Sequence, residues 1–181
     1  MSLVVLVNEN DEPLGEMDKL AAHQKGLLHR AFSVFITNSQ GQLLLQQRAL
    51  DKYHGGGLWT NTCCSHPMPG EPTLQAANRR LQEEMGFTTP LTWVHSFVYH
   101  AAVENNLIEH EYDHVFIGIY AHLPVINTAE VMQYRYASFE QIEKEIKLQP
   151  HLFTVWFKQV LPTVKQKFLE ANYLPVYELA S

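Results

Sequence analysis

The chain has 181 residues, a net charge of −6, 46% hydrophobic residues and 18% charged ones. This is long enough for one domain with a sizeable hydrophobic core, and short for two. The negative charge excludes a general attraction to nucleic acid or anionic lipid, so a phosphate-bearing substrate has to be held by local cations or by a metal. No apolar stretch reaches the roughly 18 residues that a membrane span requires. We expect neither nucleic acid nor a membrane as a partner.

The N-terminal residues and the cysteines indicate in which cellular compartment the protein works. Residues 1–8 have no basic region and too short an apolar run for a signal peptide. The only cysteines are Cys63 and Cys64, and adjacent cysteines rarely form a disulfide because the bond would be strained. Two free thiols indicate a reducing compartment, so we expect a cytoplasmic protein. We also expect a monomer or a weak homodimer.

Short strand signals dominate the first third of the chain. Apolar, β-branched and aromatic runs between turn-forming residues predict strands at residues 3–7, 14–17, 31–37 and 42–47, with turns at 8–13 and 38–41. Residues 19–30, which include His23 and His29, are expected to form an exposed loop. The glycine run 55–57 predicts a mobile or tightly turned loop.

One helix is well marked in the middle of the chain. Pro72 suits its first turn, and Gly86 suits its C-terminal cap. Between them, apolar residues repeat at helical spacing at Leu74, Ala77, Leu81 and Met85.

Strand and helix signals alternate in the second half. Strands are predicted at residues 92–103, 107–121 and 130–137, the first two around a turn at 104–106. Ser138 and Gln141 resemble a capping box that opens a helix to about residue 148. From Thr154 onward, apolar residues four apart predict a last helix, and Pro162 should kink or break it. Without repeats or linkers, this order predicts one α/β domain in which helices cover a mixed sheet.

A thiol and an imidazole lie two residues apart at Cys64 and His66. A Cys beside a His serves as a deprotonated nucleophile, as an acid–base group or as part of a metal site. The alternative is a pair of buried cysteines near a surface histidine.

A second group of ligands lies on the predicted strand 107–121. Alternate side chains share one face of a strand, so Glu109, Glu111 and Asp113 point the same way. Such carboxylates repel one another unless a cation or a proton lies between them. Three histidines complete a possible three-His, two-Glu set: His23, His29 and His66. This set suits Zn²⁺, Mn²⁺ or Mg²⁺ better than Ca²⁺, and the alternative is a solvated acidic edge strand with unrelated surface histidines.

Four cations stand beside these segments and are able to clamp phosphate oxygens. They are Lys19, Arg48, Lys52 and Arg80. The alternative is that each is an ordinary solvent-facing charge.

The motif Asn61-Thr62-Cys63-Cys64-Ser65-His66-Pro67 resembles the cysteine motif of the type I isopentenyl-diphosphate isomerases, a branch of the Nudix superfamily. Other segments match the same family in the same order: Lys19-Leu20-Ala21-Ala22-His23, Leu28-His29-Arg30-Ala31-Phe32-Ser33, Leu45-Gln46-Gln47-Arg48-Ala49, Trp59-Thr60-Asn61 and Glu109-His110-Glu111. The resemblance runs from about residue 3 to about residue 160.

Residues 65–87 also keep the spacing of a Nudix box, through Glu71, Arg79, Glu83, Glu84 and Gly86. Two departures matter here. Ser65 stands where a Nudix hydrolase box begins with Gly, and Arg80 stands where its catalytic Glu is expected. The loss of that carboxylate argues against pyrophosphate hydrolysis and is typical of the isomerase branch.

The resemblance implies a Nudix-like mixed β-sheet sandwiched between helices, as a single isomerase domain over residues 1–181. The implied reaction is the 1,3-allylic shift of isopentenyl diphosphate to dimethylallyl diphosphate in isoprenoid biosynthesis. Such a shift needs a proton donor, a base on the opposite side and exclusion of water. Cys64 and Glu111 match those two groups.

Further roles follow only from this resemblance. The implied ligands of one divalent metal (Mn²⁺, Zn²⁺ or Mg²⁺) are His23, His29, His66, Glu109 and Glu111. Glu84 holds a second cation, Mg²⁺, against the diphosphate, and the substrate-binding cations are Lys19, Arg48, Lys52 and Arg80. Tyr99 is expected to assist Glu111, and Trp156 to face the carbocation. Cys63 has no matched role and is interpreted as a packing residue.

Two other classes of function stay open at this point. A Nudix hydrolase would use the same helix on a nucleoside diphosphate or another pyrophosphate, but Arg80 counts against it. A non-enzymatic metal or thiol redox protein would use the cysteines and histidines. The pair Glu109 and Glu111 with its group of cations counts against that second class.

Overall fold

Strand β3 (His29–Thr37) lies at the centre of the sheet in the computed structural model, which describes residues 2–173. Within this range the other strands of the sheet are β1 (Leu3–Val7), β2 (Pro13–Asp18), β4 (Leu43–Arg48), β5 (Trp59–Thr60), β6 (Cys63–Ser65), β7 (Thr92–Val103), β8 (Leu107–Ile119) and β9 (Val131–Ala137). The helices are α1 (Lys19–Lys25), α2 (Thr73–Met85), α3 (Phe139–Leu148) and α4 (Val155–Glu170), with short 3₁₀ turns at Glu104–Asn106 and Pro150–Leu152.

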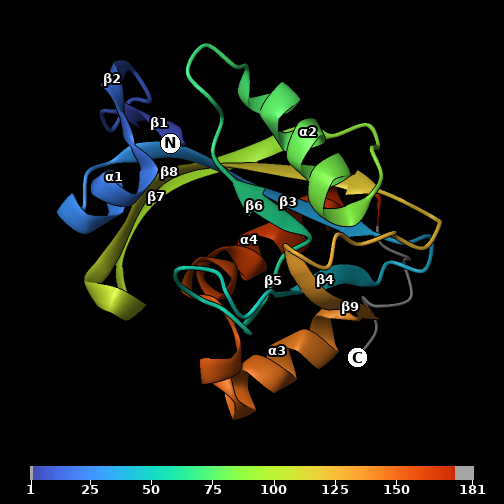
Figure 1. The fold of residues 1–181 in the computed structure, drawn as a ribbon. Coiled ribbons are helices and arrows are strands. Elements are labelled where there is room, and N and C mark those ends of the chain that lie inside the picture. Colours follow the sequence, from blue (N-terminus) through green and yellow to red (C-terminus); the bar gives the residue numbers. More distant parts are fainter. Residues whose placement is uncertain (1, 174–181) are drawn as a thin grey trace.

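The register of β3 brings distant segments of the chain together. It pairs in parallel with β8, which sets His29 beside Glu111. It pairs antiparallel with β6, which sets Ser33 beside Cys64. Strands β7 and β8 form a long hairpin that curves away from the rest of the sheet (Figure 1). The predicted thiol and carboxylate segments therefore flank one central strand.

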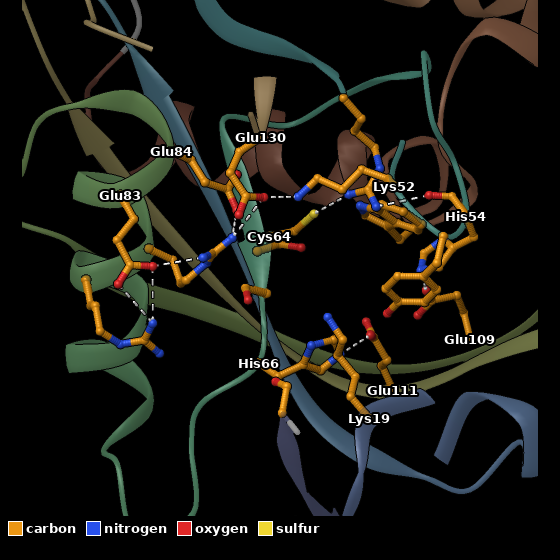
Figure 2. Close-up of a pocket in the computed structure, with 18 of the residues that line it drawn as sticks. Lys19, Lys52, His54, Cys64, His66, Glu83, Glu84, Glu109, Glu111 and Glu130 are labelled. Atoms are coloured by element: carbon orange, nitrogen blue, oxygen red, sulfur yellow. Dashed lines mark hydrogen bonds and ion pairs between the residues drawn. The ribbon is translucent and has the colours of Figure 1, made fainter. Parts of the chain in front are cut away.

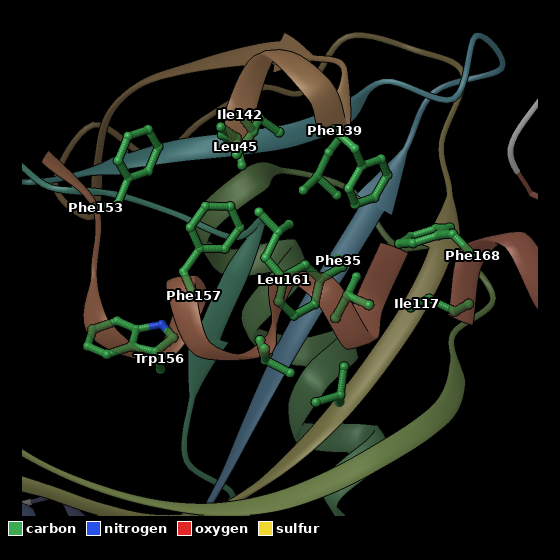
Figure 3. Packing of buried hydrophobic residues seen from close by; sticks show 14 of the residues in the cluster. Phe35, Leu45, Ile117, Phe139, Ile142, Phe153, Trp156, Phe157, Leu161 and Phe168 are labelled. Atoms are coloured by element: carbon green, nitrogen blue, oxygen red, sulfur yellow. The ribbon is translucent and has the colours of Figure 1, made fainter. Parts of the chain in front are cut away.

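The two faces of the sheet bury different halves of the core. Along β3, Phe35 packs with α3 and α4, whereas Val34 and Ile36 pack with α2. Figure 1 shows α2 on one side of the sheet and α4 on the other, and Figure 3 shows the α4 side. This alternation is the period-two pattern of a strand buried on both faces. The predicted fold, a mixed sheet sandwiched between helices, is confirmed.

The expectation of an exposed loop at residues 19–30 is wrong. Residues 19–25 form α1, which begins after Asp18, whose carboxylate accepts a hydrogen bond from the Ala21 amide. The helix ends at Gly26, which has the left-handed conformation that glycine adopts readily (φ 61°). His23 is fully buried because α1 packs against β8. Seven residues are too few to show an apolar period, so this segment carries no helical signal in its sequence.

The last helix and the motif segment also differ from expectation. Of the kink or break predicted at Pro162, the break does not occur, because helix α4 includes the proline and continues to Glu170. Val160 and Val164 are buried on either side of the proline, and this packing outweighs the roughly 3 kcal/mol cost of a helical proline. Strands β5 and β6 were not anticipated, since two and three residues carry no periodicity. None of the described helices is both long and apolar enough to cross a membrane.

Candidate active site

A cavity of about 540 Å³ opens where β6, β8, α2 and the loop 51–57 meet. Most of the residues that the sequence predicts for the site line this cavity: Lys19, Arg48, Lys52, Cys64, His66, Arg80, Glu84, Tyr99, Glu109, Glu111 and Trp156. His23 and His29 are fully buried and contact the carboxylates of the cavity wall. Figure 2 shows the acidic end of α2 on one side and the His66–Glu111 pair on the other.

Imidazoles and carboxylates converge on one side of the cavity. His29 Nε2 and His66 Nε2 lie 3.2 Å apart. His66 Nε2 lies 2.8 Å from Glu111 Oε1, and His29 Nε2 lies 3.6 Å from the same oxygen. His23, from α1, brings its Nε2 to 3.5 Å from Glu109 Oε1. His23 thus comes from α1, His29 from the start of β3 and His66 from the residue after β6, and β8 supplies both glutamates.

The outer ring nitrogens show how two of these imidazoles are oriented. His23 Nδ1 lies 2.7 Å from the Lys19 carbonyl oxygen, and His29 Nδ1 lies 2.8 Å from the Leu27 carbonyl oxygen. A carbonyl oxygen only accepts hydrogen bonds, so each Nδ1 carries the hydrogen and each neutral ring directs an Nε2 lone pair inward. Metal-ligating histidines make this same outer contact with a backbone carbonyl.

The donor set fits a divalent cation. The ligand atoms of His23, His29, His66 and Glu111 lie within 4.8 Å of one another, and those of His23, His54 and Glu109 form a second such group. Inward lone pairs and two carboxylates are a repulsive arrangement unless a cation or protons lie among them. Imidazole nitrogen with carboxylate oxygen suits first-row divalent metals.

Tyr99 joins the two glutamates. Its hydroxyl donates to Glu111 Oε2 at 2.5 Å and lies 3.3 Å from Glu109 Oε2. Burial and the charges of both glutamates raise the pKa of Tyr99 well above its usual value, so it stays a donor. Burial alone would raise the pKa of Glu111, but the neighbouring imidazoles of His29 and His66 outweigh it and hold that pKa well below its usual range.

Cys64 and Cys63 face opposite sides of β6. Cys64 faces the cavity, with its sulfur 3.7 Å from Arg48 Nη1. Burial raises the pKa of Cys64 to about 12, against the lowering effect of Arg48, so its thiol is protonated at neutral pH. Cys63 is fully buried among the residues that pack against α2, as expected of a packing residue. Their neighbouring positions on one strand explain why only Cys64 reaches the cavity.

The opposite side of the cavity is a network of ion pairs. Arg80 contacts Glu84, donates to Glu83 at 2.8 Å and lies 3.4 Å from Glu130. Lys52 also pairs with Glu130. The second oxygen of Glu84 accepts from Gln46 at 2.9 Å. Each of these carboxylates already has a cationic partner.

Lys19 and Arg48 complete the group of cations. Burial, and then the charges of Lys52 and Arg80, lower the pKa of Lys19, and all three cations line the cavity. The Arg48 guanidinium lies 5.4 Å from the ring centre of Trp156. Cations held together in this way are suited to a multiply charged anion.

Trp156 belongs both to the core and to the cavity wall. It is 4% exposed and packs with the α4 residues of the core, while its Nε1 donates to Asn61 Oδ1 at 3.3 Å. It also lines the cavity. The geometry therefore accommodates a packing role and a substrate-facing role in the same side chain.

Sequence reasoning assigned no role to several polar residues of the cavity, among them Tyr53, His54 and Glu130. His54 Nε2 lies 2.6 Å from Glu109 Oε1. Tyr53 and Glu130 contact His23 and Lys52, respectively. Their only signal in the sequence is their position. Tyr53 and His54 stand between Lys52 and the glycine run, and Glu130 directly precedes β9.

Comparison with known proteins gives consistent matches. The NUDIX domain model matches residues 27–159. An isopentenyl-diphosphate Delta-isomerase of Pectobacterium atrosepticum is 56% identical over 86% of this chain and 87% of that protein. A second protein of that name, from Photorhabdus laumondii, is 50% identical over 93% of this chain and 95% of its own. A crystal structure of a Deinococcus radiodurans protein has a TM-score of 0.68 at 20% identity, covering 81% and 90% of the two chains, which shows the shared fold.

Proposed function

Because the chain belongs to the isopentenyl-diphosphate Delta-isomerase family of the Nudix superfamily, we propose that it converts isopentenyl diphosphate to dimethylallyl diphosphate. Half or more of the residues are identical to relatives of that name along nearly their whole length. The observation that carries the proposal is one cavity with a protonated thiol at Cys64, a carboxylate at Glu111 and a group of cations. In this proposal, residues 1–181 are one isomerase domain that acts in isoprenoid biosynthesis.

The chemistry follows from two proton transfers. Protonation of an unactivated double bond leaves a tertiary carbocation, and removal of a proton from the neighbouring carbon moves the double bond. Cys64 supplies the first proton because its thiol is protonated at neutral pH. Glu111 accepts the second, since its lowered pKa keeps it ionised, and Tyr99 fixes the orientation of its carboxylate.

The metal ligands in this proposal are His23, His29, His66, Glu109 and Glu111. A divalent cation bound there, Zn²⁺, Mn²⁺ or Mg²⁺, would neutralise the paired carboxylates and keep Glu111 in place. In this proposal Glu109 serves as a metal ligand only. Its Oε2 lies 3.3 Å from the Tyr99 hydroxyl, whereas Glu111 Oε2 lies 2.5 Å from it, so Tyr99 orients Glu111 more directly. The orientation of the imidazoles supports this ligand set.

The substrate diphosphate binds among Lys19, Arg48, Lys52 and Arg80 in this proposal. Lys52 and Arg80 are paired with carboxylates. The phosphate oxygens therefore either replace these carboxylates as partners of the two cations or bind the cations together with them. Glu84 is the residue that would hold an accompanying Mg²⁺, with Arg80 turning from Glu84 to the phosphate. Trp156 faces the carbocation, where its ring stabilises positive charge without reacting with it.

The alternatives are less well supported. In a Nudix hydrolase a glutamate would stand at position 80, and here Arg80 is engaged with three carboxylates. A dithiol redox function would need Cys63 and Cys64 to meet, yet one is buried against α2 and the other faces the cavity. Because Cys64 has to stay a free thiol, we propose that the enzyme works in a reducing compartment such as the cytoplasm.

The test is incubation with isopentenyl diphosphate and Mg²⁺ in D₂O. We expect dimethylallyl diphosphate that carries deuterium in its new methyl group, because the proton comes from an exchangeable thiol. Release of phosphate or of a monophosphate would instead identify a hydrolase. A product without solvent deuterium would exclude the two-transfer scheme while leaving the isomerase activity standing.

A further inference from the structure

His54 lies in the loop 51–57 and contacts a metal-site carboxylate from outside the five proposed ligands. It is 5% exposed, and its Nε2 lies 2.6 Å from Glu109 Oε1. Its ring stands edge-on to that of Trp156, with 6.0 Å between the ring centres. No motif of the sequence assigns it a role.

The contacts of its two ring nitrogens indicate which one carries the hydrogen. His54 Nδ1 is buried and has no hydrogen-bond partner among the described residues. A hydrogen on Nδ1 would leave a buried donor unsatisfied and set two lone pairs against each other at Nε2 and Glu109. The neutral ring therefore carries its hydrogen on Nε2 and donates it to Glu109. A nitrogen that holds a hydrogen has no lone pair for a metal.

We propose that His54 is the positioning residue of Glu109: it donates to Oε1 and so fixes how this carboxylate is presented to the metal. The inference rests on the metal site of the proposed function and adds a residue to it. Carboxylate ligands of metals are commonly held by such a hydrogen bond from a neighbouring group.

Two hydrogen bonds that hold the loop 51–57 in place support this role. The Gly55 amide donates to Glu104 Oε2 at 3.1 Å, and Asn105 Nδ2 donates to the Tyr53 carbonyl at 2.7 Å. Gly55 itself has a positive φ of 60°, so the chain can turn there and direct His54 inward. Both anchoring side chains come from the tip of the β7–β8 hairpin. The donor and the carboxylate it holds are therefore fixed by the same hairpin.

Two substitutions separate the hydrogen bond from the ring. His54→Phe keeps a ring against Trp156 but removes the donor, and His54→Gln keeps an N–H donor but removes the ring. Zn²⁺ affinity is measured without substrate, by competition with a chelating dye. We expect His54→Phe to weaken Zn²⁺ binding about 10- to 100-fold, the usual loss for such a partner. We expect His54→Gln to stay close to wild type, as should the control His122→Phe on an exposed loop.

The absorption spectrum of bound Co²⁺ then distinguishes a positioning residue from a ligand. It should be unchanged in His54→Phe at saturating Co²⁺, because all five ligands remain. A spectrum that shows a lost nitrogen ligand would make His54 a ligand and overturn the proposal, as would wild-type affinity in His54→Phe or equal weakening in His54→Gln. Thermal melts of the metal-free variants check that folding is intact. Absence of Zn²⁺ binding in the wild type would overturn the metal site itself.

Discussion

The two sides of the cavity handle buried charge in opposite ways. On the α2 side, Glu84 and Glu130 are each paired with Arg80, and Glu130 also with Lys52. On the β8 side, Glu109 and Glu111 are surrounded by imidazoles, which are neutral unless protonated. Buried charges need a partner of opposite sign, so the first side is complete by itself and the second requires a cation from outside.

The two sides of the cavity therefore suit different kinds of ligand. In the proposed function, the side with the imidazoles would hold a metal ion, and the cations of the other side would exchange their carboxylate partners for the anionic substrate. Cys64 lies between the two sides (Figure 2). Substitutions on the β8 side should therefore weaken metal binding, whereas substitutions on the α2 side should weaken binding of the anion.

The largest effect is expected at the thiol between the two sides. Cys64→Ala should lower kcat about 10²- to 10⁴-fold, the usual contribution of general acid catalysis. Cys63→Ala is the matched control: it removes the same group from the core and should lower the melting temperature while activity persists. Kinetics and thermal melts of both proteins test this. The reverse pattern would show that the wrong cysteine has been assigned.

On the metal side, Glu111→Gln keeps the shape of the side chain and removes its charge. Turnover should fall by a similar factor of about 10² or more, and Zn²⁺ should bind more weakly. Glu83→Gln on α2 is the control, because Glu83 is half exposed and its partner Arg80 keeps two other carboxylates. Metal content and kinetics, measured on the same samples, test both expected losses. Normal turnover in Glu111→Gln would exclude it as the base.

Metal removal should affect stability as well as activity. A ligand present at 100 times its Kd stabilises the folded state by about 2.7 kcal/mol. Treatment with a chelator should therefore lower the melting temperature of the wild type and abolish activity, and a divalent metal should restore both. Glu111→Gln should respond less. An unchanged melting temperature in the chelated wild type would contradict a metal on the β8 side.

Substitution of Trp156, which lines the cavity, tests whether its ring contacts the carbocation. A cation over an indole face gains about 2 kcal/mol once water is excluded, or about 30-fold in rate if the gain is confined to the transition state. Trp156→Leu should lose about this much in kcat with less change in KM, and Trp156→Phe should lose less. If Trp156→Leu only lowers the melting temperature, the residue serves the core alone.

The smallest effect concerns an ion pair beside the cavity. Hydrogen bonds from Arg79 lower the pKa of Glu71. A carboxylate whose pKa is lowered by folding adds stability above its unfolded pKa, and this is lost as pH falls through the folded value. The pair should contribute less than about 1 kcal/mol near neutral pH. Denaturant unfolding of wild type and Glu71→Gln, above and below the usual range of Glu, should differ only at the higher pH.

Much of the fold was predictable because long elements bury residues at regular spacing. The strand alternation at Glu109 and Glu111 and the four-residue spacing from Trp156 along α4 both recur in the structure. Helix α1 was missed because its burial comes from packing against β8 rather than from its own pattern. Contacts between segments that are distant in sequence cannot be predicted from the local residue pattern.

The site was predictable to the extent that motifs mark it. The resemblance named Cys64 and His66, and the structure brings them together with Glu111. It did not name His54, whose contact with Glu109 depends on how a glycine-containing loop turns. It also could not show that Arg80 is engaged by carboxylates, because ion-pair partners are set by side-chain geometry.

The central position of β3 has a consequence for how the site forms during folding. The contacts of His66 span 37 residues to His29 and 45 residues to Glu111. Contacts of such sequence separation form only after long loops close, and proteins dominated by them fold slowly. The ligand set therefore does not exist in any local fragment of the chain. The amides of β3 should exchange with solvent only through global unfolding, so loss of the site and loss of the fold should be one cooperative event.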